Sequence, residues 1–179
     1  MRSEAISLLT NEQLVFVLPS LAHGGAQKVF LEMASYLALN GYAPLLVILD
    51  AEGELLQQLD PNVDTLFLDN GIEWSGPFKR FIQLLRFRKI VSKATATKVY
   101  STITGMNIFA LIALFKLQNS TVIIREASSL ENLTSCVIYY LSKILYRSAN
   151  RVVCTSGYVK EQMLAQYDLA PERVTIIPN

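Results

Sequence analysis

Short apolar stretches alternate with helical patterns along the whole chain. The stretch at residues 14–18 is hydrophobic at every position, as expected for a strand covered on both faces. Similar stretches, separated by apolar residues at helical spacing, predict strands at 14–18, 45–49, 65–68, 98–103, 121–124, 151–155 and 174–177, and helices at 29–38, 54–59, 77–91, 105–117, 130–146 and 157–167. Strands that alternate with helices indicate an α/β fold with a parallel sheet and helices on both faces.

Size and composition narrow the class of protein. The 179 residues are enough for one domain with a full core, and 51% hydrophobic with 17% charged residues excludes a disordered chain. Cys136 and Cys154 are too few and too far apart for a disulfide framework or a structural zinc site. The opening residues contain acidic side chains and no long apolar stretch, so we expect no secretory signal. The longest continuous apolar run, residues 108–115, has the length of a buried core helix and is too short to span a membrane.

The charge is unevenly distributed. Residues 1–73 carry ten acidic against two basic residues, whereas residues 74–125 carry nine basic residues and no acidic one. A basic block of this kind attracts phosphates, nucleic acids or anionic membranes; since no nucleic-acid recognition motif accompanies it, we expect no nucleic-acid partner. On a helix over 77–91, one face should pack on the sheet, namely Phe78, Phe81, Ile82 and Leu85. The opposite face should meet an anionic membrane surface through Lys79, Arg80, Arg86 and Phe87; the alternative is a solvated basic face with one stray Phe.

A glycine pair stands between the first predicted strand and the helix after it. Gly24 and Gly25 would let the backbone approach a ligand, and the first amides of the helix would donate to an anion. His23, the only histidine, lies beside them and could meet a hydroxyl or phosphate. The alternatives are a tight turn without a ligand and a solvent-facing histidine. The G-x-G-x-x-G spacing is absent, which disfavours a classical NAD site.

Two further candidates follow later strands. Arg125 and Glu126 come directly after residues 121–124, where side chains can face a ligand cleft; an ordinary surface ion pair is the alternative. Ser156 opens the helix at 157–167 and is a good N-cap, which we favour over a role as a cleft hydroxyl. No P-loop, G-x-S-x-G or H-E-x-x-H motif is present.

In order and spacing, these segments resemble family 4 glycosyltransferases of the GT-B fold. The stretch from Val15 to Val29 resembles their opening strand, glycine pair and helix, with Gln27 and Lys28 in place of the usual Glu-Arg. Residues 123–126 are similar to the segment after the fifth strand, and 149–156 with 171–179 resemble the end of the first domain, with Asn150 in place of a common Asp.

The resemblance implies that residues 1–179 form a single Rossmann-like, acceptor-binding domain, the N-terminal half of a GT-B enzyme, with the donor-binding C-terminal domain absent from this chain. The intact enzyme would transfer a sugar, as a hexosyltransferase, from a nucleotide-sugar to a hydroxyl or lipid-linked acceptor in polysaccharide or glycolipid synthesis. It would need no metal or other cofactor, and it would work in the cytoplasm or at the inner face of the membrane. We expect the fragment alone to be inactive.

In this interpretation Gly24 and Gly25 bring backbone amides to the diphosphate or acceptor, and Arg125 and Glu126 orient the acceptor. No catalytic base is identified. Two alternatives stay open: a standalone Rossmann-like module that binds a phosphorylated ligand, and a subunit that pairs with a separate donor domain.

Overall fold

The computed structural model describes residues 13–22, 24–127 and 136–178. Seven strands form one sheet in the order β3-β2-β1-β4-β5-β6-β7, and every neighbouring pair is parallel. The strands are β1 (Gln13–Leu18), β2 (Pro44–Ile48), β3 (Asp64–Phe67), β4 (Thr97–Thr102), β5 (Ser120–Glu126), β6 (Arg151–Cys154) and β7 (Val174–Ile176). The strand order reverses between β1 and β4, as in Rossmann-like folds, so the fold predicted from the alternation is confirmed.

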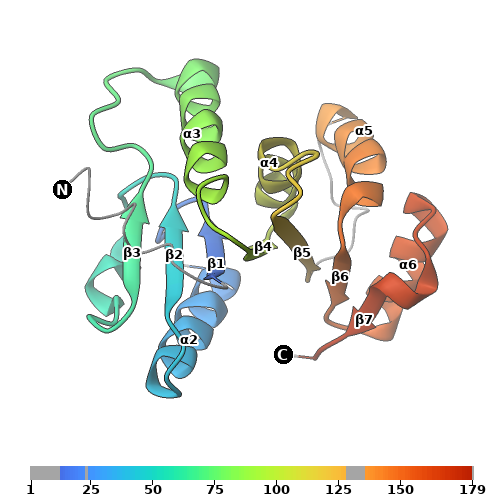
Figure 1. The fold of residues 1–179 in the computed structure, drawn as a ribbon. Helices are drawn as coiled ribbons and strands as arrows, with labels where there is room; N and C mark the ends of the chain where they lie inside the picture. The colour runs from blue at the N-terminus through green and yellow to red at the C-terminus, as the bar shows by residue number, and fades with distance from the viewer. Residues whose placement is uncertain (1–12, 23, 128–135, 179) are drawn as a thin grey trace.

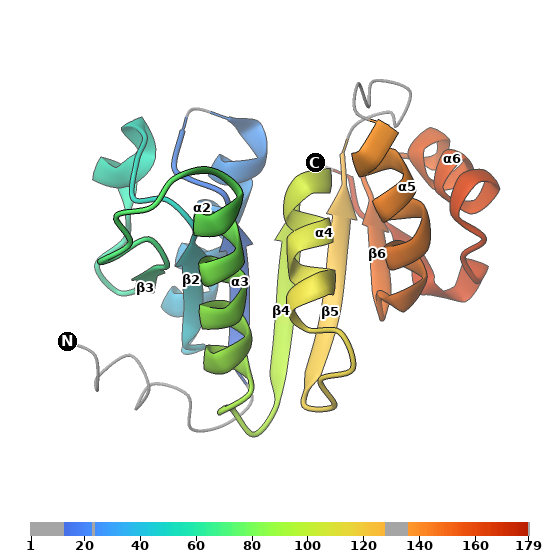
Figure 2. The same ribbon diagram turned by 90° about the horizontal axis from the view of Figure 1, so that it is seen from above.

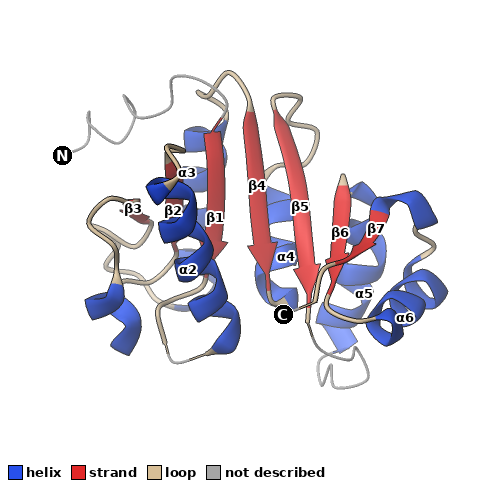
Figure 3. Cartoon of the chain, turned by 90° about the horizontal axis from the view of Figure 1, so that it is seen from below, coloured by secondary structure: helices blue, strands red, loops and turns tan. Residues whose placement is uncertain are grey.

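Helices cover both faces of the sheet, but unequally. They are α2 (Gly25–Leu39), α3 (Gly76–Val91), α4 (Thr104–Ala113), α5 (Cys136–Leu145) and α6 (Gly157–Tyr167), with short 3-10 helices η1 (Glu54–Gln58), η3 (Tyr146–Ser148) and η4 (Pro171–Arg173). The order of the helices along the chain is visible in Figure 1. Figure 2 shows α3, α4 and α5 side by side on one face, and Figure 3 shows α2 on the other. α6 packs into the same core as α3, α4 and α5, whereas η1 shares the core of α2.

Strand β1 supplies side chains to two separate cores. Val15 and Val17 point into the core under α3, α4, α5 and α6, while Phe16 and Leu18 point into the core under α2 and η1. Alternation along a strand sends successive side chains to opposite faces, and parallel pairing on both sides buries both sets. All four are at most 1% exposed.

Part of the α2 face is left uncovered. α2 and η1 lie over the N-terminal strands, and on that face Tyr100, Ile123 and Val153 of β4, β5 and β6 remain only half-buried. The same strands bury Val99, Ile124 and Val152 completely on the other face.

Helix α3 is rotated relative to the orientation expected from its sequence. Phe78, Phe81 and Leu85, expected against the sheet, are 53%, 56% and 48% exposed. Phe87, expected at a membrane surface, is fully buried and stacks on Phe109 with 5.8 Å between ring centroids. The predicted facing of this helix, and with it the placement of Phe87 on a membrane surface, is therefore wrong.

Helix α4 is the most completely buried helix of the layer, as the apolar run 108–115 predicted. It ends earlier than expected, because Leu114 already forms the C-cap and Lys116 takes a left-handed conformation with φ +57°. The predicted start of α5 at residue 130 lies outside the described residues. None of the helices in the described parts of the chain has the length and apolar character to cross a membrane.

Candidate functional site at the carboxyl edge of the sheet

Three helices begin at the edge where the parallel strands end. α2, α4 and α6 follow the carboxyl ends of β1, β4 and β6, and the arrowheads of β1, β4 and β5 reach this edge in Figure 3. Each of these helices has a glycine in its first turn, and a Cβ placed on Gly25, Gly105 or Gly157 would meet no atom within 4 Å. The first amides of a helix lack intrahelical acceptors, so the edge offers anion donors with open space above them.

The glycine pair opens α2 without a special backbone conformation. Gly24 is extended, with φ −166° and ψ 143°, so glycine is not required there by its dihedral angles. A Cβ on Gly24 would lie 2.3 Å from the Oε1 atom of Gln27, which is the end of a flexible side chain. The space above Gly25 is open, as close approach of a ligand requires. His23 lies outside the described residues.

Gly53, in the turn between β2 and η1, fixes the loop before α2. Gly53 has φ +117°, and a Cβ there would lie 2.1–2.2 Å from backbone atoms of Leu21 and Ala22. The Leu21 amide also donates to the Glu52 carbonyl at 2.9 Å, and its own carbonyl accepts from the Leu55 amide at 3.0 Å. The β2–η1 turn therefore holds the β1–α2 loop in place through these two hydrogen bonds and the close backbone contact at Gly53.

Glu126 is the centre of a buried hydrogen-bond network. The side chain is 1% exposed. Its Oε1 accepts hydrogen bonds from the hydroxyl of Tyr146 and from Nδ2 of Asn107 (2.8 Å), and its Oε2 accepts one from the hydroxyl of Thr104 (3.5 Å). Asn107 is itself fixed, because its Oδ1 accepts from Ser101 at 2.7 Å. Because Glu126 is enclosed in this way, its expected contact with an acceptor is wrong for this structure.

Burial raises the pKa of Glu126, while the donors Tyr146, Asn107 and Thr104 and the charge of Arg125 act to lower it. The pKa of Tyr146 is raised well above 10 by burial and by the charge of Glu126, so its hydroxyl stays a donor. Burial, aided by Glu126, raises the pKa of Cys154 to about 11, so this thiol is not a reactive nucleophile. The network therefore holds the end of β5 and the start of α4 in shape, with the Glu126 side chain enclosed.

The backbone is strained in the turn between β4 and α4, next to this network. Ile103, between β4 and α4, has φ +71° and ψ 126°, a conformation that a β-branched residue rarely adopts. Such strain costs about 1–3 kcal/mol and persists only where the surroundings impose it. Here Thr104, the next residue, bonds to the fixed carboxyl of Glu126, and the amides of Met106 and Asn107 donate to the Ile103 carbonyl. The side chain of Ile103 is consequently displayed at the edge, 39% exposed.

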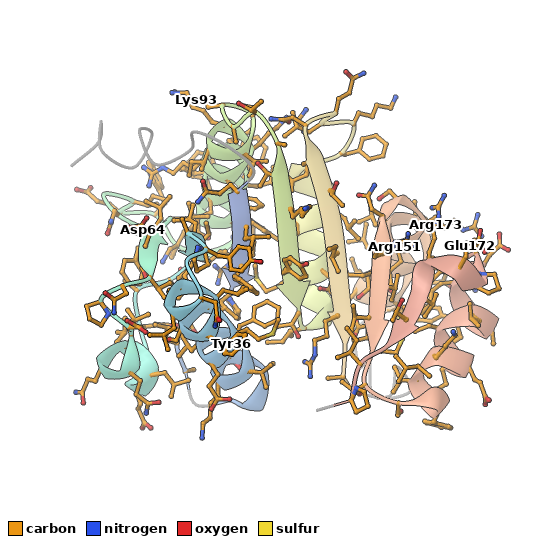
Figure 4. All side chains as sticks on the ribbon, turned by 60° about the horizontal axis from the view of Figure 1, so that its bottom comes forward. Tyr36, Asp64, Lys93, Arg151, Glu172 and Arg173 are labelled. Atoms are coloured by element: carbon orange, nitrogen blue, oxygen red, sulfur yellow. The ribbon has the colours of Figure 1, made fainter. Side chains whose placement is uncertain are left out.

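Arg125 and Glu126 lie on opposite faces of β5, because they are successive residues of one strand. Arg125 lines a groove of about 470 Å³ on the partly uncovered α2 face. Its guanidinium reaches the hydroxyl of Thr102 at 3.4 Å. Burial lowers the pKa of Arg125 and the charge of Glu126 opposes that shift, yet an arginine stays cationic. The remaining lining is mostly apolar and includes Met33, Tyr36, Tyr100, Ile123, Val153 and Ile177. Figure 4 labels Tyr36 on α2 and, for orientation, Arg151 at the amino end of β6.

Ser156 is the N-cap of α6, as expected. Its Oγ accepts a hydrogen bond from the Val159 amide at 3.3 Å.

A larger hollow, of about 610 Å³, lies at the opposite edge of the sheet and is lined by Leu114, Lys116 and Asn150, among others. Ligands of open α/β sheets bind at the carboxyl ends of the strands, so we do not assign the site to that hollow.

The basic residues assigned to a membrane surface are bound within the chain. Asp50, just after β2, accepts from Lys79 at 2.8 Å and from Arg80 at 2.7 Å. Burial raises the pKa of Asp50, but hydrogen bonds from Lys79, Arg80 and Gln83 outweigh it and hold the pKa below its usual value. Arg86 donates to the carbonyls of residues 68 and 70 at 2.9 and 2.8 Å. Lys79, Arg80 and Arg86 therefore anchor α3 and its preceding loop, and their expected role at a membrane surface stays a prediction.

Sequence reasoning missed Asn107, Tyr146 and Asp50. Asn107 is the one amide side chain in an otherwise apolar helix, a signal that it needs buried partners. Asp50 directly follows an apolar strand and so had to lie at the carboxyl edge. Tyr146 gave no signal, because its partner lies twenty residues away. Across residues 13–22, 24–127 and 136–178, no three His, Cys, Asp or Glu side chains gather closely enough to ligate a metal ion.

The fold is shared with known glycosyltransferases. A glycosyltransferase from Rickettsia africae ESF-5 superposes with a TM-score of 0.70 at 18% identity, over 94% of this chain and 43% of that one. The lipopolysaccharide outer core galactosyltransferase WaaB in its apo form gives 0.68 at 13% identity, over 93% and 45%. Anabaena Alr3699/HepE in complex with UDP and glucose gives 0.69 at 15% identity, over 94% and 44%. The chain thus spans less than half the length of these solved proteins.

Sequence comparison gives the same result from independent information. No curated protein sequence matches this chain. The sequence profile of Glycosyltransferase Family 4, however, matches residues 23–179, from the glycine loop at the start of α2 to the segment after β7. With its Rossmann-like sheet and its match to GT-B neighbours, this chain belongs to glycosyltransferase family 4.

Proposed function

We propose that this chain is the acceptor-binding half of an enzyme that transfers a sugar from a nucleotide-sugar to a hydroxyl acceptor. The observation that carries the proposal is the carboxyl edge itself, with an open glycine N-terminus on α2 beside the groove that holds Arg125. Membership of family 4 supports the reaction class. The neighbour HepE has been solved with UDP-glucose, which supports a nucleotide-sugar as donor.

Each feature of the edge has a part in this reaction. The amides at Gly25 would stabilise negative charge on the leaving diphosphate or on the acceptor, because preorganised donors act most strongly where charge develops. Arg125 would hold the acceptor, since a guanidinium pairs well with phosphate or carboxylate groups. Glu126 would act indirectly, by fixing the turn at Thr104. The donor would be bound mainly by a second half, and the reaction would take place in the cytoplasm, in cell-surface polysaccharide or glycolipid synthesis.

The test compares donor hydrolysis with sugar transfer. In a protein that joins this chain to a family 4 donor half, Arg125→Ala should lower transfer to acceptor at least tenfold and leave hydrolysis of the nucleotide-sugar nearly unchanged. Arg151→Ala is the matched control, since this exposed arginine lies at the amino end of β6, away from the groove, and donates to the Glu172 carbonyl at 2.6 Å. It should leave both rates unchanged.

Three results would overturn the proposal. Equal transfer by the Arg125→Ala and wild-type proteins would remove Arg125 from the acceptor site. Release of UDP from UDP-glucose by the 179-residue chain alone would place the donor site within this chain. A joined protein without any transfer, together with phosphate-ligand binding by the chain alone, would instead support a binding module.

A further inference from the structure

The turn between β4 and α4 carries an isoleucine at a position where glycine would fold more easily. With φ +71° and ψ 126°, Ile103 lies outside the left-handed region that residues other than glycine tolerate. Asp168, at the end of α6, lies inside that region, with φ +50° and ψ 48°. Glycine adopts positive φ at much lower cost, as Gly53 does at φ +117°. The backbone of the turn therefore gives no reason for a β-branched side chain, and the side chain itself needs an explanation.

Packing does not supply that explanation. In the described parts of the chain, Ile103 is 39% exposed and belongs to neither of the two hydrophobic cores. The buried network imposes its conformation, because the adjacent Thr104 donates to the Glu126 carboxyl at 3.5 Å. The amides of Met106 and Asn107 hold the Ile103 carbonyl at 2.9 and 3.0 Å. Strain that is imposed by the surroundings in this way collects at functional sites.

Ile103 lies at the point where the strand order of the sheet reverses. The chain leaves β1 for α2 on one face and leaves β4 for α4 on the other, and Figure 3 shows α2 in front of the sheet and α4 behind it. Connections that diverge in this way leave a crevice between the ends of the two strands, where open α/β sheets bind their ligands. Ile103 is the first residue after β4, so it lies at this crevice.

The polar candidates of the site lie on either side of Ile103. Val17 of β1 pairs with Ser101 of β4, so the glycine loop that follows β1 begins beside the end of β4. On the other side, Thr102 pairs with Arg125 of β5, and the Arg125 guanidinium donates to the Thr102 hydroxyl at 3.4 Å. The crevice thus combines amide donors and a cation with an apolar side chain between them. A sugar ring with an anionic substituent matches this arrangement, because it presents a charge, hydroxyls and a face of carbon-bound hydrogens.

We propose that Ile103 contacts the acceptor and determines its specificity, by packing against the carbon-bound hydrogens of a sugar ring whose phosphate or carboxylate pairs with Arg125. The acceptor class is therefore a saccharide with an anionic substituent. Thr104 and Glu126 are positioning residues, because they act on the acceptor only through the strained turn. The role of the bound sugar as acceptor rests on the proposed function, whereas the contact itself is measured by binding alone.

Methyl NMR of the 179-residue chain tests the contact directly. The Ile103 methyl signal is the isoleucine signal that disappears in Ile103→Val. We expect it to shift during titration with glucose 6-phosphate or with glucuronic acid, and the two affinities distinguish a phosphate from a carboxylate as the preferred substituent. Inorganic phosphate should leave the signal in place, and the neutral methyl glucoside should bind about tenfold more weakly. An Ile103 signal that moves with neither anionic sugar would overturn the proposal.

Two isoleucines with the same exposure form a matched pair. Ile103 and Ile112 are each 39% exposed, but Ile112 lies near the end of α4, which runs away from the carboxyl edge. Ile103→Ala should weaken binding of the better anionic sugar about fivefold, because it removes an apolar contact. Ile112→Ala should bind like wild type, and the conservative Ile103→Val should bind nearly as well. Equal affinities of Ile103→Ala and wild type would overturn the proposal.

The stability of glycine and alanine variants tests the strain at the same two positions. At Ile112, inside a helix, the glycine variant should melt a few degrees below the alanine variant. At Ile103 the order should be reversed, because glycine relieves a positive φ and alanine does not. Both Ile103 variants should nevertheless lose affinity for the sugar. An alanine variant that melts higher at both positions would overturn the strained display of Ile103.

Thr104 tests the positioning role separately from the contact. Thr104→Val removes the hydroxyl that donates to Glu126 and keeps the shape of the side chain. It should shift the Ile103 methyl signal in the absence of sugar and weaken sugar binding, and Thr104→Ser should restore both. A Thr104→Val chain with an unchanged Ile103 signal and unchanged affinity would overturn the positioning of Ile103 by this network.

Failure of this inference can be distinguished from failure of the proposed sugar transfer. In the protein joined to a donor half, Ile103→Ala should raise the KM for the anionic sugar acceptor and leave hydrolysis of the nucleotide-sugar unchanged. Transfer with the same KM in both proteins would overturn the role of Ile103 and leave the reaction in place. An Ile103 shift with anionic sugars, in a chain whose joined form transfers no sugar, would support the contact and contradict the proposed function.

Discussion

Removal of the Tyr146 hydroxyl tests whether the buried network around Glu126 is organised as described. Tyr146→Phe keeps the ring, which is fully buried and stacks on Tyr167 with 5.0 Å between centroids. It removes a donor from the Glu126 carboxyl, while Asn107 keeps its bonds to Glu126 Oε1 and to the Arg125 carbonyl. A hydrogen bond to a charged group contributes about 1.5–3 kcal/mol and a neutral one about 1 kcal/mol.

The cost should depend on pH. Burial raises the pKa of folded Glu126 above its unfolded value of about 4.5. Its contribution to stability is therefore fully present below pH 4.5 and is lost as pH rises through the folded pKa. The ionised carboxylate needs its donors most, so Tyr146→Phe should reduce the free energy of unfolding by about 1 kcal/mol at pH 4 and by a larger amount, up to about 2 kcal/mol, once the pH has risen through the folded pKa of Glu126.

Urea denaturation followed by circular dichroism at pH 4, 6 and 8 measures this difference. Tyr167→Phe is the matched control, because its equally buried hydroxyl contacts the neutral Ser142 at 3.2 Å. This variant should lose about 1 kcal/mol at every pH. A cost for Tyr146→Phe that equals the control at pH 8, or that does not change with pH, would refute the proposed pairing with an ionisable carboxyl.

Three further predictions concern the edge of the sheet. Gly53→Ala should reduce the free energy of unfolding by at least about 3 kcal/mol, because its Cβ would collide with the backbone of the β1–α2 loop. Gly71→Ala is the control: at φ +67° and with open space around it, it should reduce the free energy of unfolding by only about 1 kcal/mol. Equal shifts of the two melting temperatures in calorimetry would contradict this. Asp50→Asn should reduce the free energy of unfolding by about 1–2 kcal/mol at pH 7, because it weakens the bonds to Lys79 and Arg80. Since the folded pKa of Asp50 is lowered, that difference should vanish as pH falls below about 3.8 in acid denaturation; a constant difference would count against it. Gly25→Val should leave the melting temperature within a few degrees of wild type and abolish transfer in the joined protein; full activity would remove the loop from the site.

Sequence patterns predicted the sheet well for a physical reason. Strands of a parallel sheet are buried on both faces, so each reads as a continuous apolar run that stands out between helices. The carboxyl edge also followed from the pattern, because the residues after each strand must meet there. The opposite facing of Arg125 and Glu126 could have been predicted from strand alternation alone.

The orientation of α3 could not be predicted from its sequence. A helical wheel favours the face with Phe78, Phe81 and Leu85, but the buried face carries Gln83 and Phe87. Gln83 can be buried because its Nε2 donates to the Leu49 carbonyl at 2.6 Å, on a segment more than thirty residues away. Polar burial of this kind depends on partners that only the tertiary structure provides.

The division of β1 between two cores limits how the gene can change in length. Deletion or insertion of one residue within residues 13–18 would exchange the two sets of side chains, so that phenylalanine would enter the space that Val15 and Val17 fill, while valine would leave a void beside Phe30. Insertion or deletion of a single codon would therefore disrupt the packing of both cores. Among related chains, differences in length should therefore be found in the loops around the sheet, and the spacing within this strand should stay constant.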